Sequence, residues 1–303
     1  MNKNSLMSFN VLNAWQPISS VYKTVRTRAE GAAAFILEQL PDILCLQEFD
    51  YYYRKDTEFL SLLGQEYVEA DTQGELGAQS WNPIFYRKSK YRCVASGGLD
   101  FAANGFTLVF ANADTYPEKA CNEYKPYRYP EGSPEANEHV PEHSRFRCLS
   151  WAVLNAENGD RILVGNTHYS LQAAFQKEEV DFVSKVMRSL QEKYVCPVLM
   201  CGDFNSTTVW GAASMMLANG FLDTYDMAEM RNDIGSCHES SGKGGSKDVD
   251  KMPGGTYKTH ALDHIFTTQR LTVESYRIFA EEQLLSVSYN CPTMIKFQTV
   301  FPL

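Results

Sequence analysis

The chain has 303 residues, of which 44% are apolar and 21% charged, and its formal net charge is −9 at pH 7. No run of about 18 apolar residues occurs, so the sequence predicts no membrane-spanning helix. The negative charge argues against extended electrostatic binding of nucleic acid, because such binding needs a basic surface. Because a metal bound in an acidic cleft reverses the local field, a short oligonucleotide, a nucleotide or a phosphorylated small molecule remains open as a partner.

Apolar periodicity and turn residues predict the elements in chain order. A strand ending at Asn10 precedes a helix over residues 25–40, which Pro41 ends. The other predicted helices cover 56–63, 173–193 and 209–219, with Gly220 as a cap. The other predicted strands cover 42–48, 83–87, 91–95, 107–111, 147–154, 161–168, 197–202, 261–267, 272–279 and 293–300. Segments 114–145 and 227–255 are predicted to be long loops.

The strands outnumber the helices, and helices separate only some of them. This pattern predicts an α/β (α+β) fold in which two mixed β-sheets pack face to face with helices outside. The motifs described below extend over nearly the whole chain, so we predict one domain over residues 1–303.

The N-terminal residues lead directly into the first strand without an apolar signal segment, which predicts a cytoplasmic protein if Met1 is the native start. The eight cysteines have no zinc-site spacing, and Cys45 and Cys201 lie within apolar runs. We therefore expect mostly buried free thiols rather than disulfides or metal ligands.

Polar residues close four of the apolar runs, namely Asn10, Glu48, His168, and the pair Asp203 and Asn205. Burying such side chains in a core would cost free energy unless the strand ends line one cleft that holds water or a metal ion. The sequence therefore predicts one polar site built from residues far apart along the chain.

Carboxylate and amide oxygens suit Mg²⁺ or Mn²⁺, and we predict Glu48 as the metal ligand, supported by Asn10 directly or through water. A surface glutamate after a strand is the alternative for Glu48. Asp203 and Asn205 lie two residues apart, so both side chains point to one side if strand geometry continues. The alternative for this pair is an Asp-X-Asn turn that satisfies its own backbone.

The chain resembles the endonuclease/exonuclease/phosphatase superfamily, which includes deoxyribonuclease I, and locally the nocturnin and deadenylase branch. The resemblance rests on Ser-Phe-Asn at 8–10, Leu-Gln-Glu at 46–48, Asn-Pro-Ile-Phe-Tyr-Arg-Lys at 82–88, Asn-Thr-His at 166–168, Gly-Asp-Phe-Asn at 202–205 and Leu-Asp-His-Ile-Phe at 262–266. Each motif is weak alone, but their shared order is specific. The resemblance implies a four-layer sandwich and metal-dependent phosphoester hydrolysis.

The resemblance also implies roles for individual residues. Asp203 would orient or deprotonate the attacking water or serve the leaving group, Asn205 and Asn10 would hold phosphate, and His168 would donate a hydrogen bond to it. The alternative for His168 is a satisfied core histidine. Arg147 is a further candidate phosphate ligand, with a structural salt bridge as the equal alternative.

The chain departs from the family at its C-terminal motif. The family pattern Ser-Asp-His aligns with Ser288-Tyr289-Asn290, so tyrosine replaces the aspartate and asparagine the histidine. An amide cannot take up a proton near neutral pH, and general base catalysis is typically worth roughly 10²–10⁴ in rate. Asp263, which pairs with that histidine in the family, would be left without its partner.

Other histidines are weaker substitutes for the missing one. His264 should face away from Asp263 because strand side chains alternate, while His139 and His143 lie in a predicted loop.

Two functions follow. The first is a phosphodiesterase or phosphatase with Mg²⁺ or Mn²⁺, whose activity the missing histidine would reduce, acting on RNA, DNA, a nucleotide or another phosphate-containing substrate. The second is a catalytically impaired relative that binds a phosphate ligand or a protein partner, although no specific protein partner is predicted.

Overall fold

The computed structural model describes residues 3–13, 24–71, 81–102, 105–110, 147–157, 159–171, 173–240, 249–251, 253–269 and 271–299. Two seven-stranded sheets form its centre. Sheet A contains, in spatial order, β11 (Met230–Arg231), β15 (Thr272–Ile278), β16 (Thr293–Gln298), β1 (Asn4–Asn10), β2 (Ile43–Gln47), β4 (Ile84–Arg87) and β3 (Tyr67–Glu69). Sheet B contains β10 (Leu222–Asp223), β14 (Asp263–Thr267), β9 (Val198–Asp203), β8 (Arg161–His168), β7 (Cys148–Ala156), β5 (Tyr91–Ala102) and β6 (Gly105–Phe110).

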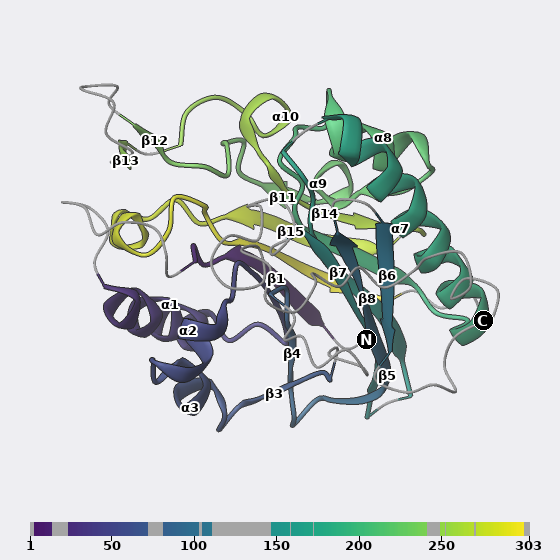
Figure 1. Cartoon of the computed structure of the whole chain (residues 1–303), viewed down its shortest axis with the longest axis horizontal. Helices are drawn as coiled ribbons and strands as arrows, with labels where there is room; N and C mark the ends of the chain where they lie inside the picture. The colour runs from purple at the N-terminus through teal and green to yellow at the C-terminus, as the bar shows by residue number, and fades with distance from the viewer. Residues whose placement is uncertain are drawn as a thin grey trace, which may run out of the picture.

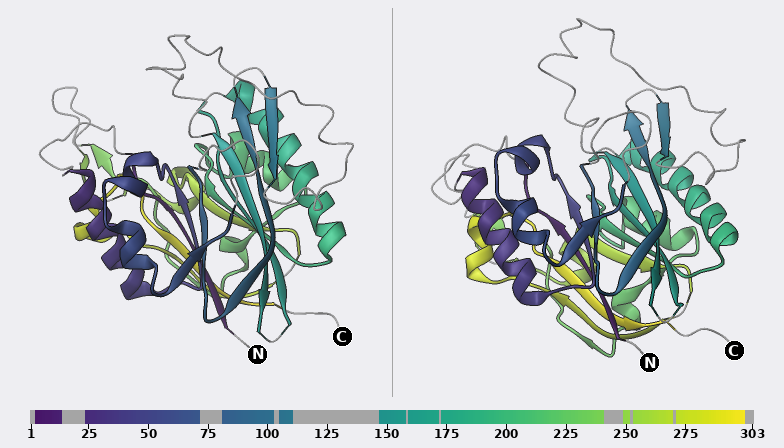
Figure 2. Two further views of the ribbon diagram at one scale, coloured as in Figure 1. Left: turned by 60° about the horizontal axis from the view of Figure 1, so that its bottom comes forward. Right: turned by 90° about the horizontal axis from the view of Figure 1, so that it is seen from below.

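Helices cover the outer faces of both sheets (Figures 1 and 2). The helices are α1 (Val25–Gln39), α2 (Tyr51–Lys55), α3 (Phe59–Leu63), α7 (Ala173–Tyr194), α8 (Gly211–Ala218), α9 (Thr224–Met227), α10 (Tyr257–His260) and the 3-10 turn η3 (Glu282–Ser286). A small hairpin pairs β12 (Glu239–Ser240) with β13 (Val249–Lys251).

Three apolar clusters hold these layers together. The central cluster lies between the sheets and includes Leu6 and Ile43 of sheet A and Val164 of sheet B. The second packs sheet B against α7 and α8, and the third packs sheet A against α1, α2, α3 and η3. The resulting order of helices, sheet, sheet and helices confirms the predicted four-layer sandwich.

Both sheets are mixed. In sheet A, β1 runs parallel to β2 and antiparallel to β16. In sheet B, β8 runs parallel to β9, and β9 runs antiparallel to β14. Because parallel neighbours end at the same edge of a sheet, these connections bring distant polar residues together.

Helix α1 follows its sequence signals closely. Its N-cap Thr24 accepts a hydrogen bond from the Thr27 amide, and the helix ends where Leu40 adopts a left-handed φ of 48° just before Pro41. This is the end that the proline predicted.

The helix predicted over 56–63 differs from the observed structure, which has α2 and α3 there. The Thr57 hydroxyl donates to the Tyr53 carbonyl at 2.6 Å and accepts from the Phe59 amide at 3.2 Å. The Thr57 side chain thus ends α2 and begins α3, because its hydroxyl competes with the backbone for helical hydrogen bonds.

Strand β5 continues well beyond the predicted end at Ala95. Gly97 and Gly98 read as a strand end in the sequence, yet they pair with Trp151 and Ser150 of β7. Pairing with a neighbour outweighs their low strand propensity.

The predicted loop 227–255 contains β11, β12, β13 and the segment 235–238, which lies beside 288–291. The predicted loop 114–145 lies outside the described residues. None of the helices in the described ranges is long and apolar enough to cross a membrane. The seven cysteines in those ranges are free, and Cys45, Cys196, Cys201 and Cys291 are buried.

Candidate active site

The strand ends bring the predicted polar residues to one place. Asn10 is paired with Gln47 at the end of β1 and β2, and Glu48 follows directly. In sheet B, His168 of β8 and Asp263 of β14 are both paired with Asp203 of β9. The two groups meet because the Asn10 amide nitrogen donates to Glu48 Oε1 at 3.1 Å and to Asp203 Oδ2 at 3.0 Å.

Backbone strain concentrates at these same strand ends. Leu12, Glu48 and Asn205 have positive φ values of 61°, 58° and 48°. Side chains with a Cβ rarely adopt this region, and such conformations cost about 1–3 kcal/mol each. The surrounding contacts hold the strained turns after β1, β2 and β9 in place.

The Glu48 carboxylate is buried and receives several donors. Besides Asn10, its Oε2 accepts from the Asn13 backbone amide at 2.9 Å and from the Asn13 side chain. Tyr289 lies at 3.5 Å from Oε1. The Asn10 side-chain oxygen accepts from the Leu12 amide at 3.0 Å, which fixes the orientation of the Asn10 amide.

Asp203 is also buried and is the centre of the site. Its Oδ2 accepts from Asn290 Nδ2 at 3.1 Å in addition to Asn10, and His168 Nε2 lies 3.5 Å away. Burial raises the pKa of the Asp203 carboxyl above its ordinary value, and the Glu48 charge raises it further. The hydrogen bonds from Asn205 and Asn10 oppose that shift.

Asn205 does not continue the strand geometry on which its predicted orientation depended. Strand β9 ends at Asp203, and the Asn205 amide donates to Asp203 Oδ1 at 2.9 Å, as in an Asp-X-Asn turn. The Asn205 side chain donates to the Tyr169 carbonyl at 2.8 Å. The left-handed backbone, rather than the period of two, therefore sets its direction.

His168 and Arg147 are buried beside Asp203 with polar atoms unpaired. Among the described residues, His168 Nδ1 and Arg147 Nε and Nη1 have no hydrogen-bond partner, and the Arg147 guanidinium forms no salt bridge. Burial lowers the pKa of His168 well below its ordinary value, and the Arg147 charge lowers it further. The unpaired nitrogen atoms of these two side chains suit a bound anion.

Asp263 does have a partner, which corrects the expectation that it would be left alone. Ser236 Oγ donates to Asp263 Oδ2 at 2.7 Å, while Oδ1 has no partner within the described ranges. The sequence missed this contact because Ser236 lies in a segment predicted to be a loop. Burial raises the pKa of Asp263 well above its ordinary value, and the Asp203 charge adds to the shift.

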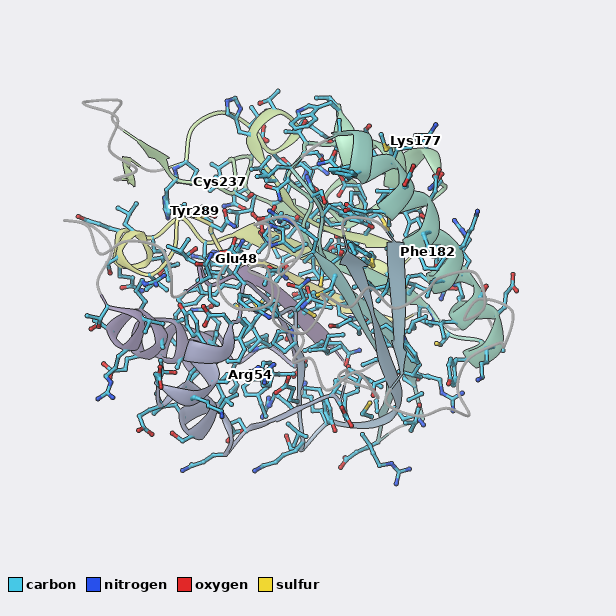
Figure 3. The ribbon with its side chains drawn as sticks, viewed as in Figure 1. Glu48, Arg54, Lys177, Phe182, Cys237 and Tyr289 are labelled. Carbon is cyan, nitrogen blue, oxygen red and sulfur yellow. The ribbon has the colours of Figure 1, made fainter. Side chains whose placement is uncertain are left out.

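The two substituted positions both face the site. Figure 3 shows Tyr289, Glu48 and Cys237 near one another, whereas Arg54 and Phe182 lie away from them. Asn290 is fully buried, and Cys237 Sγ donates to its Oδ1 at 2.9 Å.

His264 takes no part in the candidate site. His264 contacts the Tyr257 hydroxyl at 2.8 Å and the Ser206 carbonyl at 2.9 Å, so it has the structural role expected from strand alternation. His139 and His143 lie outside the described residues.

Sequence reasoning missed five contributors to the site, namely Asn13, Gln47, Asn166, Ser236 and Cys237. Gln47 and Asn166 had a signal, since both are polar residues within apolar runs predicted to be buried strands. Gln47 Nε2 donates to Asn166 Oδ1 at 2.6 Å, which joins the two sheets below the site. The other three lie in segments without a pattern, and only the fold brings them close.

The donor set fits a hard divalent cation. No group of three or more His, Cys, Asp or Glu side chains has a metal-binding arrangement within the described part of the chain. However, Mg²⁺ usually keeps several waters and needs only one or two protein carboxylates. The side-chain nitrogen of Asn10 donates to both Glu48 and Asp203. These two residues supply the carboxylates that such a cation needs.

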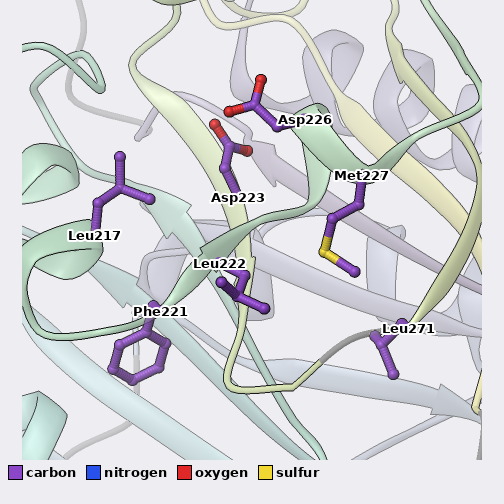
Figure 4. A pocket seen from close by; sticks show the side chains of 7 residues that line it. All are labelled: Leu217, Phe221, Leu222, Asp223, Asp226, Met227 and Leu271. Atoms are coloured by element: carbon purple, nitrogen blue, oxygen red, sulfur yellow. The ribbon is translucent and has the colours of Figure 1, made fainter.

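A separate cavity of 570 Å³ lies at the β10 edge of sheet B (Figure 4). Apolar side chains such as Phe221 and Met227 line it together with Asp223 and Asp226. None of the predicted site residues lines it, so it is distinct from the candidate site.

The comparisons with known proteins agree with this geometry. The family model described as Endonuclease/Exonuclease/phosphatase family matches residues 7–286. A search of curated protein sequences finds no match.

Solved structures of this fold cover nearly the whole chain. A mannosyl-6-phosphatase from Bacteroides thetaiotaomicron has a TM-score of 0.69 at 17% identity, covering 98% of this chain and 100% of that one. TDP2 from D. rerio, complexed with single-strand DNA product, has a TM-score of 0.64 at 15% identity, covering 99% and 100%. The human Nocturnin catalytic domain with bound sulfate anion has a TM-score of 0.61 at 16% identity, covering 98% and 94%. With the family model matching most of its length, the chain belongs to the endonuclease/exonuclease/phosphatase family.

Proposed function

We propose that this protein is a metal-dependent phosphoesterase that hydrolyses a phosphodiester or a phosphomonoester at the site around Asp203. One observation carries the proposal: two buried carboxylates share the Asn10 amide, His168 Nε2 lies 3.5 Å from one of them, and His168 and Arg147 keep buried nitrogen atoms without a hydrogen-bond partner among the described residues. Carboxylates suit a cation, and a guanidinium beside an imidazole suits a phosphate, so both parts of a metal–phosphate complex have matching groups.

Mg²⁺ or Mn²⁺ would be held by Glu48 with support from Asn10, and it would neutralise charge on the phosphoryl oxygens. Arg147 and His168 would bind the non-bridging oxygens, and their burial strengthens those hydrogen bonds by excluding water. Asp203 would orient the attacking water, since its Oδ2 is held at a fixed position by Asn10 and Asn290. Asp263 would support this arrangement from the neighbouring strand.

The substrate class is proposed from charge and from the relatives. The net charge of −9 disfavours a long nucleic acid, which would need a basic surface. The similar structures include a mannosyl-6-phosphatase and a protein complexed with single-strand DNA product. We propose a small phosphate ester or a short oligonucleotide.

The first test removes the Glu48 charge. With Mg²⁺ or Mn²⁺ present, the purified protein should hydrolyse bis(p-nitrophenyl) phosphate or p-nitrophenyl phosphate above the buffer rate. Glu48→Gln should lower kcat/KM by at least about 100-fold, since even the supporting partners of metal ligands are typically worth 10–100-fold.

Glu192→Gln is the matched control, because Glu192 is exposed on α7 and lies outside the site. It should leave the rate unchanged. Equal rates for Glu48→Gln and the unmodified protein would refute the proposal.

One observation favours a second function, namely binding without turnover. Three side-chain or backbone donors already reach the Glu48 carboxylate, and the Asn10 and Asn290 amides reach Asp203. Buried carboxylates that accept several hydrogen bonds are stabilised without a cation. If turnover stays at the buffer rate while calorimetry detects inorganic phosphate binding that Arg147→Ala abolishes, the protein is a phosphate-binding relative without enzymatic activity.

A further inference from the structure

The Asn290 side chain has one orientation that its surroundings permit. Its Nδ2 donates to Asp203 Oδ2 at 3.1 Å, and its Oδ1 accepts from Cys237 Sγ at 2.9 Å. A flipped amide would place its oxygen against the Asp203 carboxylate, which offers only acceptors when ionised. The Cys237 thiol, by donating, holds the amide in the orientation that suits Asp203.

The backbone keeps Cys237 and Asn290 opposite each other. The two residues form an antiparallel bridge, flanked by hydrogen bonds of 2.7 Å from the His238 amide to the Tyr289 carbonyl and from the Cys291 amide to the Ser236 carbonyl. Ser288 Oγ accepts from the Asn290 amide at 3.1 Å and donates to the Asn10 carbonyl at 2.7 Å. The Asn290 backbone is therefore tied to both β1 and the segment 235–238.

The same segment serves Asp263. Ser236 Oγ donates to Asp263 Oδ2 and accepts from the Asp263 amide at 3.0 Å. Gly235 lets this segment pack against Gly254 and His260, since a Cβ there would lie 2.7 Å from the Gly254 carbonyl oxygen. Consecutive residues Ser236 and Cys237 thus hold Asp263 and Asn290, the two positions that are affected by loss of the terminal histidine.

We propose that Cys237 is a positioning residue that orients the Asn290 amide toward Asp203, so that Asn290 serves the site as a fixed hydrogen-bond donor. This inference rests on the proposed phosphoesterase function for its kinetic consequence. The connected groups are a thiol, an amide and a carboxylate, and the amide that reaches Asp203 Oδ2 does not titrate near neutral pH. Precise placement of reacting groups is worth large factors in rate, and a displacement of about 1 Å can cost about 10²-fold.

The kinetic test compares Cys237→Ala with Cys237→Ser. Alanine removes the donor, and kcat for bis(p-nitrophenyl) phosphate should fall at least about tenfold with KM changed less than about twofold. Serine keeps a donor, and kcat should stay within about threefold of the original. Cys93→Ala is the matched control, because Cys93 is a partly buried thiol on β5 that donates to the nearby Ala95 carbonyl and contacts none of the site residues named here, and it should leave both constants unchanged.

A second measurement does not need turnover. In protein labelled with ¹⁵N-asparagine, Asn290→Asp identifies the side-chain amide signals of Asn290 by their loss. Their exchange with solvent should be at least about tenfold faster in Cys237→Ala than in the original protein, and close to the original in Cys237→Ser.

The two measurements separate the two proposals. A protein without turnover whose Asn290 signals respond as expected would contradict the phosphoesterase function and support the positioning role. Equal exchange in the original and Cys237→Ala proteins, or a serine variant no better than the alanine variant while both remain folded, would overturn the positioning role.

Discussion

Burial and neighbouring negative charge raise the pKa of two carboxyl groups at the site, Asp203 and Asp263. Asp263 has a pKa well above its ordinary value because it is buried and because the Asp203 charge lies close, and Glu48 adds to both shifts. Negative charge confined in this way is relieved by a cation. This relief supports the proposed dependence on a divalent cation.

His264 provides a prediction about stability. Burial lowers its pKa to about 4, and the unfolded chain has the ordinary value of about 6.5. The folded state thus binds fewer protons than the unfolded state, so the stabilisation is complete above pH 6.5 and is lost as the pH falls toward 4. The difference corresponds to about 3 kcal/mol.

The measurement is chemical denaturation between pH 7.5 and 4.5. The raised pKa values of Asp203 and Asp263 act in the opposite direction, so the contribution of His264 is read as the difference between the original protein and His264→Gln. The variant should be less stable at pH 7.5 and should lose less stability on acidification. His260→Gln, at an exposed position on α10, is the control. Parallel pH profiles for His264→Gln and the original protein would contradict the assignment.

At the level of elements, the parallel pair β8 and β9 carries His168 and Asp203 side by side. Gly202 has a φ of 141°, and a Cβ there would lie 1.8 Å from the Thr167 carbonyl oxygen. Only glycine lets the two strands approach at this point. The close approach places Asp203 beside His168.

Gly202→Ala should therefore be strongly destabilising. Strained backbone costs about 1–3 kcal/mol, and the contact with Thr167 adds to it. Gly159→Ala is the matched control, because Gly159 also has a positive φ, 89°, but no atom lies within 4 Å of the added Cβ. We expect a loss of about 1 kcal/mol for Gly159→Ala and at least about 2 kcal/mol more for Gly202→Ala in urea denaturation. Equal losses would show that the close approach is unimportant.

At the level of the whole molecule, Asn166 joins the two sheets. It lies on β8 in sheet B, and its Nδ2 donates to the Leu46 carbonyl of sheet A at 2.8 Å and to the Pro83 carbonyl at 2.9 Å. Its Oδ1 accepts from Gln47. Polar groups buried between apolar sheets stabilise only when they are paired, and these pairs fix how the sheets lie against each other.

Asn166→Ala should lower the free energy of unfolding by about 2–4 kcal/mol, because it removes three buried hydrogen bonds, including the shortest one that Gln47 Nε2 donates. Asn155→Ala is the control, since Asn155 accepts one bond from Arg161 at the partly buried end of the β7–β8 hairpin. It should cost less than about 1 kcal/mol. A loss no larger than the control's would mean that the sheets are aligned by apolar packing alone.

Local signals in the sequence predicted the fold class and most elements. The apolar runs gave β2, β8 and β9, helical periodicity with Pro41 gave α1, and the neighbouring strands predicted over 147–154 and 161–168 correspond to β7 and β8. Predictions were wrong where contacts from elsewhere override local preference, as at Gly97 and Gly98 in β5 and in the loop predicted over 227–255.

The sequence by itself determined which chemical groups the chain can offer, because residue type and the ends of apolar runs are local properties. It marked Asn10, Glu48, His168 and Asp203, and it marked the loss of the terminal histidine. Only the tertiary structure decided what those groups contact. Ser236 and Cys237 lie in a segment without any pattern, and their hydrogen bonds to Asp263 and Asn290 span 27 and 53 residues. Hydrogen bonds act over about 3 Å of space, whereas sequence patterns report only on neighbours along the chain.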